Sequence, residues 1–300
     1  MNPVHVSVMP QEVIACLVPD KDRAVIVDGT LGEGGHSRLF LQNYPQAKVV
    51  GMDADSVMAN HAKKRIGADY GERFECRVGW NDELLAAWEG SAVDIVLLDL
   101  GLSTRHFFEM ERGFSFSRAE PLDMRFNPAE GKSAADLVNT LSAKDLADII
   151  YKYGEERFSR TIARQIAERR RMSRITDSLD LANIVSLAVP LAVRHGRIHP
   201  ATRTFMALRI AVNRELERLE RLLNIVPDML APGGKFGVIS FHSLEDRMVK
   251  QAFRKRNRRY GGEFEVVTKK PFVPSAEECA ANPSARSAKF RVLAKPQEGE

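Results

Sequence analysis

The sequence predicts an α/β protein, in which a doubly wound, Rossmann-like parallel sheet is interrupted by an inserted helical domain. Three observations support this fold class. Four short apolar runs alternate with helix-compatible stretches in the first hundred residues, the alternation stops after Leu100, and it resumes near residue 233. Regular strand–helix alternation is typical of a parallel sheet covered by helices. A chain of 300 residues is long enough to bury such a core.

The predicted strands of the first half are short runs rich in Val, Ile and Leu, as expected for strands buried on both faces. They cover residues 24–30, 47–55, 74–79 and 93–100. Stretches with helical spacing separate them, among them residues 36–44 and 55–66.

After the fourth strand, apolar residues repeat at i, i+3 and i+4 in a basic, helical stretch that extends to about residue 200. Ser142 is expected to cap one of its helices and Gly154 to end that helix. The predicted domains are a discontinuous sheet domain and a helical insertion. Their boundaries are residues 1–104 with 205–300, and residues 105–204.

The last third of the chain returns to the sheet. A single long helix is predicted over residues 201–230, followed by a further strand within residues 233–242. Residues 264–270 and 286–295 are expected to pair as an antiparallel edge.

Composition restricts the class of protein. A hydrophobic content of 44% and a charged content of 28% are typical of a soluble globular protein. No apolar run approaches the roughly 18 to 20 residues of a membrane span, and the N-terminus does not resemble a secretory signal. The three cysteines are far apart and form no CxxC pair, which argues against disulfides and zinc. We therefore expect a cytoplasmic protein without a metal.

Charge is distributed unevenly along the chain. Residues 1–99 hold 9 Lys/Arg and 15 Asp/Glu, whereas residues 151–214 hold 13 Lys/Arg and 5 Asp/Glu. A second basic block, residues 250–259, holds 6 basic residues and no acidic one. Arginine suits bidentate contacts to phosphate, so nucleic acid is the leading candidate partner, although each run is also compatible with an ordinary solvated surface.

The glycine-rich segment "DGTLGEGGH", residues 28–36, follows the first strand and predicts a turn that lets a ligand approach the backbone. It does not fit a P-loop, which requires GxxxxGK[ST]. A dinucleotide site would need a third glycine where Ser37 stands. S-adenosylmethionine fits better, because Asp53 ends the second strand at the separation expected for an acid that binds ribose hydroxyls. A pyrophosphate ligand and a turn without a ligand remain open from the residues alone.

Two further residues follow predicted strands on the ligand-binding edge of such a sheet. Trp80 follows the third strand, where an aromatic ring can lie against adenine or simply belong to the core. Asp99 ends the fourth strand, at the carboxyl edge where open α/β sheets bind ligands, and it can equally cap a helix.

Longer motifs extend the pattern over nearly the whole chain. They include "LLDLGLS", "ERGFSFSRAEPLDMRF", "YGEERFSRTIARQI", "HPATRTFMALRIAVN", "LAPGGKFGVISFHSLEDRMVK" and "NPSARSAKFRVL". With the glycine turn, they resemble the bacterial small-subunit (16S) rRNA cytosine-N4 methyltransferases, the RsmH or MraW family. The resemblance implies a class I S-adenosylmethionine-dependent methyltransferase domain with an inserted all-α domain. It also implies ribosomal RNA or the small ribosomal subunit as partner, with no role for a membrane or for DNA.

The same resemblance implies a set of cofactor-binding residues. They are Gly34, Gly35, His36, Asp53, Trp80, Asp99 and His106. The chain departs from the family at two places, since members often carry phenylalanine at the position of Trp80 and "SSPQ" at residues 103–106. These departures weaken the assignments of Trp80 and His106 and leave the implied function intact.

The exocyclic amine of cytosine is a weak nucleophile, so an enzyme that methylates it must orient the base and accept a hydrogen bond from the amine. In many amino-methyltransferases a Pro-Pro pair follows the fourth strand, and this chain has no such pair. Asp123 and His242 are therefore the candidate catalytic residues, beside the hydroxyls of Ser103 and Ser240. Asp123 can instead pair with Arg125 or Arg118, and His242 can bond the backbone at a strand end. A non-catalytic RNA-binding ribosome-assembly factor that kept the fold is the alternative function.

Overall fold

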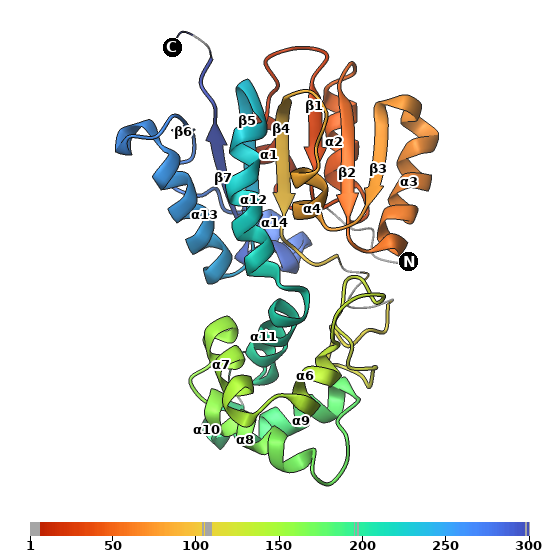
Figure 1. Ribbon diagram of the computed structural model, residues 1–300, viewed down its shortest axis with the longest axis vertical. Coiled ribbons are helices and arrows are strands. Elements are labelled where there is room, and N and C mark those ends of the chain that lie inside the picture. Colours follow the sequence, from red (N-terminus) through yellow and green to blue (C-terminus); the bar gives the residue numbers. More distant parts are fainter. Residues whose placement is uncertain are drawn as a thin grey trace. The chain divides into compact units, whose positions relative to one another are not determined.

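The structure is a computed structural model that describes residues 7–103, 105, 110–194, 196, 198–297 and 299. The chain divides into two compact units, which we call the sheet unit and the helical unit (Figure 1). The sheet unit comprises Met1–Ser103 and Leu216–Glu300, and the helical unit comprises Thr104–Glu215. The second junction therefore lies after Glu215, because the helix over Ala201–Asn213 packs within the helical unit.

The sheet unit is built on seven strands in the order β3-β2-β1-β4-β5-β7-β6. The first five in this order are parallel, and β7 is antiparallel to both β5 and β6. The strands are β1 (Val25–Asp28), β2 (Lys48–Asp53), β3 (Phe74–Val78), β4 (Val93–Asp99), β5 (Leu230–Ser240), β6 (Glu265–Val266) and β7 (Lys289–Ala294). The predicted doubly wound sheet and its antiparallel edge are confirmed.

Helices cover both faces of this sheet (Figure 1). Neighbouring strand residues point to opposite faces, so Ile26 joins the apolar cluster on one face and Val27 the cluster on the other. The first cluster packs against α1 (Pro10–Cys16), α2 (Gly35–Asn43) and α3 (Ser56–Tyr70). The second packs against α4 (Asn81–Ala86), α12 (Glu215–Met229) and α13 (Ser243–Arg256). The short helix α14 (Ala276–Ala281) precedes β7.

The strand order reverses between β1 and β4, because the chain runs outward from β1 to β3 and then returns to β4 on the other side. Open α/β sheets bind ligands at the carboxyl ends of the strands beside such a switch point. The glycine turn after β1 and Asp99 at the end of β4 both lie at this position.

The helical unit contains six helices among its described residues. They are α6 (Ala134–Thr140), α7 (Ala143–Gly154), α8 (Ser159–Arg169), α9 (Ser178–Ala188), α10 (Leu191–Arg194) and α11 (Ala201–Asn213). Ser142 caps α7 as predicted, by accepting a hydrogen bond from the backbone amide of Asp145. Gly154 is the last residue of α7, while the left-handed residue after it is Glu155. A Cβ on Gly154 would lie 2.6 Å from the backbone oxygen of Arg203, so this glycine permits α7 and α11 to pack closely.

Two predictions for this unit are wrong. The single helix expected over residues 201–230 is interrupted at Arg214, whose φ of +53° separates α11 from α12. Residues 110–133, expected to be helical, contain no helix among those described. Left-handed backbone at Gly113 and Met124 bends this segment, which Phe114 and Phe126 stabilise by stacking.

No helix in the described part of the chain is long and apolar enough to cross a membrane.

Candidate active site

The glycine turn connects β1 to α2 through left-handed backbone. Gly32 has a φ of +51° and Gly34 a φ of +79°, a conformation that side-chain-bearing residues rarely adopt. A Cβ at Gly34 would overlap the side chain of Ile66, and one at Gly35 would overlap that of Ser7. The turn therefore places the N-terminus of α2 at the carboxyl edge of the sheet, where the positive end of the helix dipole can bind a carboxylate.

Asp53 lies at the end of β2, as predicted, and its carboxylate is held by two backbone amides. Oδ2 accepts a hydrogen bond of 2.8 Å from the amide of Gly32, and Oδ1 accepts one of 2.8 Å from that of Asp55. Each carboxylate oxygen has lone pairs for more than one donor. Asp53 is thus oriented by the glycine turn at the ligand-binding edge of the sheet.

Asp99 and His36 meet where β4 and α2 approach each other. The Nε2 atom of His36 lies 3.3 Å from Oδ2 of Asp99, and the amide of Asp99 is 2.6 Å from Oγ1 of Thr30. His36 is only 6% exposed, yet neither ring nitrogen has a hydrogen-bond partner of good geometry in the part of the chain that the structure describes. A buried imidazole without such a bond is costly, so a ligand that forms a hydrogen bond with the ring would stabilise it.

Asp28 lies deeper, at the end of β1, and is 1% exposed. It accepts hydrogen bonds from Oγ of Ser37 at 2.7 Å and from the amide of Thr30 at 3.3 Å. Burial raises the pKa of Asp28 above its ordinary value, although His36 and these two hydrogen bonds lower it. Ser37, which replaces the third glycine of a dinucleotide site, thus binds a carboxyl group that supports the turn.

The charges at this edge are those of carboxylates. Glu33 in the turn is 8% exposed and accepts from Oγ of Ser103 at 3.1 Å, and Asp53 and Asp99 end the adjacent strands. Three acids in one site disfavour a pyrophosphate and favour a ligand that carries positive charge. With the helix N-terminus and the buried His36, this set fits S-adenosylmethionine, which has a sulfonium, an ammonium, a carboxylate and a ribose.

Trp80 lies two residues beyond β3 and is the N-cap residue of α4. The guanidinium carbon of Arg218, from the first turn of α12, is 3.8 Å from the centroid of the Trp80 ring. Sequence reasoning missed Arg218, because nothing in its local sequence relates it to a residue so far away along the chain. His106, the last of the expected cofactor contacts, lies outside the described residues.

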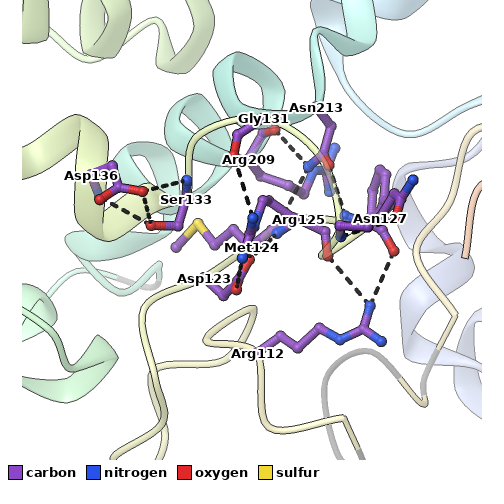
Figure 2. Close-up of polar contacts among 12 residues, drawn as sticks. Arg112, Asp123, Met124, Arg125, Asn127, Gly131, Ser133, Asp136, Arg209 and Asn213 are labelled. Atoms are coloured by element: carbon purple, nitrogen blue, oxygen red, sulfur yellow. Dashed lines mark hydrogen bonds and ion pairs between the residues drawn. The ribbon is translucent and has the colours of Figure 1, made fainter.

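Asp123 belongs to the helical unit and forms a two-point ion pair with Arg125 (Figure 2). Nε of Arg125 donates to Oδ1 at 2.7 Å, and Nη2 donates to Oδ2 at 2.8 Å. Partial burial by itself raises the pKa of Asp123, but hydrogen bonds from the Arg125 side chain and amide outweigh it, so the pKa lies below its ordinary value. Asp123 is thus an ionised acceptor held in a fixed orientation.

Two neighbours shape the backbone around this ion pair (Figure 2). The carbonyl of Arg112 accepts from the amide of Met124, whose φ is +62°. Asn213 accepts from the amide of Phe126 at 2.8 Å and donates to the carbonyl of Met124 at 2.8 Å. The carboxylate of Asp123 is therefore positioned by residues that are distant in the sequence.

His242 belongs to the sheet unit and caps α13. Its Nδ1 accepts from the amide of Glu245 at 3.4 Å, while its Nε2 lies 3.0 Å from Oε1 of Glu245. With Nδ1 accepting from a backbone amide, only Nε2 remains, and it is buried and forms no hydrogen bond of good geometry with a described residue. Ser240 donates to the carbonyl of Lys289 at 3.3 Å. In the described part of the chain, no three His, Cys, Asp or Glu side chains gather as they would around a metal ion.

Comparison with known proteins gives matches over nearly the full length. Residues 2–296 match the MraW methylase family. A protein of Treponema denticola, named ribosomal RNA small subunit methyltransferase H, is 47% identical over 310 residues, which cover 98% of each chain. Proteins of the same name from Desulfosudis oleivorans (45% over 309 residues, 97% of this chain and 98% of that one) and Synechococcus elongatus (44% over 290 residues, 96% and 93%) are similarly related.

Proposed function

The chain belongs to the MraW methylase family, and on this premise we propose that it transfers a methyl group from S-adenosylmethionine to the exocyclic N4 amine of a cytidine in small-subunit (16S) ribosomal RNA. The class I, Rossmann-like methyltransferase fold expected for this activity is confirmed by the strand order. The observation that carries the proposal is the buried His36, which lies beside Asp99 at the glycine turn and whose ring nitrogens form no hydrogen bond of good geometry with a described residue. The reaction is placed in the cytoplasm and requires neither DNA nor a membrane.

The sheet unit is proposed to hold the cofactor. When bound, S-adenosylmethionine supplies an electrophilic methyl group on a positively charged sulfur. Gly34, Gly35 and His36 would receive its amino-acid end at the N-terminus of α2. Asp53 would accept from the ribose hydroxyls, and Trp80 would lie against the adenine. Asp99 and His106 would complete the set.

The protein's contribution to the chemical step is proposed to be orientation and hydrogen-bond acceptance. Asp123 is the better acceptor for the amine, because it is ionised and held by Arg125, whereas Nδ1 of His242 already accepts from a backbone amide. An accepted hydrogen bond raises the electron density on the nitrogen as it attacks. The amine becomes cationic as the new C–N bond forms, so its proton is acidic and water can remove it. No strong general base and no covalent enzyme intermediate are required.

The helical unit is proposed to bind the RNA backbone. Three exposed arginines on and just beyond α8 make no side-chain ion pair or hydrogen bond within the described ranges, and we call them the arginine row: Arg160, Arg164 and Arg171. Their neighbours differ, since Arg169 pairs with Asp180 at 3.4 Å and Arg170 donates to the carbonyl of Val138 at 2.7 Å. Unpartnered exposed arginines can contact phosphates without disturbing the fold.

A direct test compares the nucleosides of small-subunit rRNA from cells with and without the protein by mass spectrometry. N4-methylated cytidine is expected to disappear without the protein, to return with the wild type, and not to return with Asp53→Ala. An unchanged nucleoside content would refute the proposed reaction. The alternative, a non-catalytic assembly factor, predicts in addition that the purified protein does not bind S-adenosylmethionine, and the family membership does not favour it.

A further inference from the structure

The ring of Trp80 is packed against a charged side chain that itself cannot move freely. The guanidinium of Arg218 lies over the ring at 3.8 Å, and the Arg218 side chain is only 12% exposed. A cation that is partly removed from water and placed over an indole face is attracted by the electrons of the ring. The pair is therefore a close cation–π contact, which favours the ring orientation that keeps its face toward the guanidinium.

A buried acid fixes Arg218 in this place. Asp82, which is 2% exposed, accepts from Nη1 of Arg218 and, at 3.0 Å, from Nη1 of Arg221. Glu83 accepts from Nη1 of Arg218 at 2.9 Å. Both arginines come from α12 and both acids from α4, so these bonds dock one helix on the other beside the ring.

The Nε atom of Arg218 is buried and forms no hydrogen bond with any described residue. An unpaired buried donor carries a desolvation cost. Arg221, which shares Asp82, is 48% exposed and is not stacked on an aromatic ring in the described structure. The two arginines thus have the same anchor, and of the two only Arg218 contacts the Trp80 ring.

On its other side the Trp80 segment is tied to the glycine turn. Nδ2 of Asn81 donates to the carbonyl of Gly29 at 2.8 Å, directly after β1. This hydrogen bond holds the Trp80 segment against the glycine turn at the ligand-binding edge of the sheet. The contact with Arg218 restricts the plane of the Trp80 ring.

We propose that Arg218 is a positioning residue for the adenine of the cofactor: it fixes the plane of Trp80, so that the base binds to a ring that is already oriented. This inference rests on the proposed function. Preorganisation of a contact residue increases affinity because less side-chain freedom is lost on binding. A base stacked on the ring is bound equally in the ground state and the transition state, so the effect falls on KM rather than on kcat.

The test compares two variants that each remove one partner of Asp82, Arg218→Met and the matched control Arg221→Met. Binding of adenosine and of S-adenosylhomocysteine is measured by calorimetry, and fluorescence of Trp80 is recorded in a Trp88→Phe background, where it is the single tryptophan. Arg218→Met is expected to weaken both ligands about fivefold, to raise KM for S-adenosylmethionine with kcat unchanged, and to alter the Trp80 emission. Arg221→Met is expected to leave affinity and emission unchanged.

Equal losses of affinity in both variants would assign the effect to helix docking and overturn the proposal, as would wild-type affinity in a folded Arg218→Met. If Arg218→Met does not fold, Arg218→Lys replaces it, since lysine keeps the charge beside Asp82 and loses the planar stack. That variant must then show the same loss for adenosine, and unchanged binding would equally overturn the proposal. A wild-type protein that binds neither ligand would instead refute the proposed function.

Discussion

Replacing Asp53 by alanine tests the cofactor site at the residue with the best-defined geometry. The substitution removes a carboxylate that two amides, those of Gly32 and Asp55, hold at 2.8 Å each. It therefore removes the proposed acceptor for the ribose hydroxyls and loosens the glycine turn at the same time. The experiment must separate these two effects.

The expected loss follows from the charge of the acceptor. A hydrogen bond to a charged group contributes about 1.5 to 3 kcal/mol net, so losing the ribose contact should weaken binding roughly ten- to a hundredfold. Asp55 provides the matched control, because its carboxylate caps α3 by accepting from the amides of Val57 and Met58. Asp55→Ala should cost about 1 kcal/mol of stability and leave the affinity nearly unchanged.

Calorimetry with adenosine and 2′-deoxyadenosine then isolates the hydroxyl contact. Wild-type protein should bind adenosine more tightly, whereas Asp53→Ala should bind the two nucleosides equally. If the folded variant kept the wild-type preference for adenosine, Asp53 would not contact the ribose and its role would be confined to supporting the turn.

Three further predictions concern the RNA surface, the proposed acceptor and the cysteines. Alanine at all three positions of the arginine row should lower RNA affinity and flatten its salt dependence with cofactor binding unchanged, whereas an unaltered salt slope would make them ordinary surface charges. Asp123→Asn should slow single-turnover methylation of assembled subunits more than it weakens cofactor binding, and an unaffected rate would leave Asp123 with its ion pair alone. Because the pKa of Asp123 is lowered on folding, its carboxylate stabilises the protein above its unfolded pKa, near 3.8. The stability difference between wild type and Asp123→Asn should therefore be present at neutral pH and be lost as the pH falls through the folded pKa, a trend that denaturant titrations at several pH values can check. Serine in place of all three cysteines should leave activity intact, since burial raises the pKa of Cys16 and Cys76 and disfavours the thiolate. A folded but inactive triple variant would contradict methylation of the amine.

The sheet and its acids could be predicted from sequence because they follow from local periodicity. A parallel strand buried on both faces is a continuous apolar run, and the residue that ends it lies at the carboxyl edge. This rule predicts the positions of Asp53 and Asp99, and each ends its strand in the structure. The glycine turn was equally visible, since Gly34 occupies backbone that other residues avoid.

Features that depend on tertiary packing could not be predicted in this way. Arg214 has good helix propensity, yet it takes a left-handed conformation that ends α11 before α12 begins. The sequence predicts only that Gly154 ends a helix. The structure shows that the absence of a side chain at Gly154 lets the backbone of Arg203 approach closely. The sequence pattern predicts that Arg218 is a surface charge on an amphipathic helix, and only the fold places it against the Trp80 ring.

The two candidate acceptors show how contacts decide between residues that sequence treats alike. Asp123 and His242 are both polar side chains in motifs of the resemblance, and both have a local partner, Arg125 two residues away and Glu245 three residues away. The accepting nitrogen of His242 is already occupied, because the backbone amide of Glu245 donates to Nδ1. The partner of Asp123 donates to a carboxylate whose oxygens can each accept again. An arginine beside a carboxylate therefore keeps the carboxylate ionised and oriented and leaves lone pairs that can accept further hydrogen bonds. This difference makes Asp123 the residue on which the proposed chemistry depends.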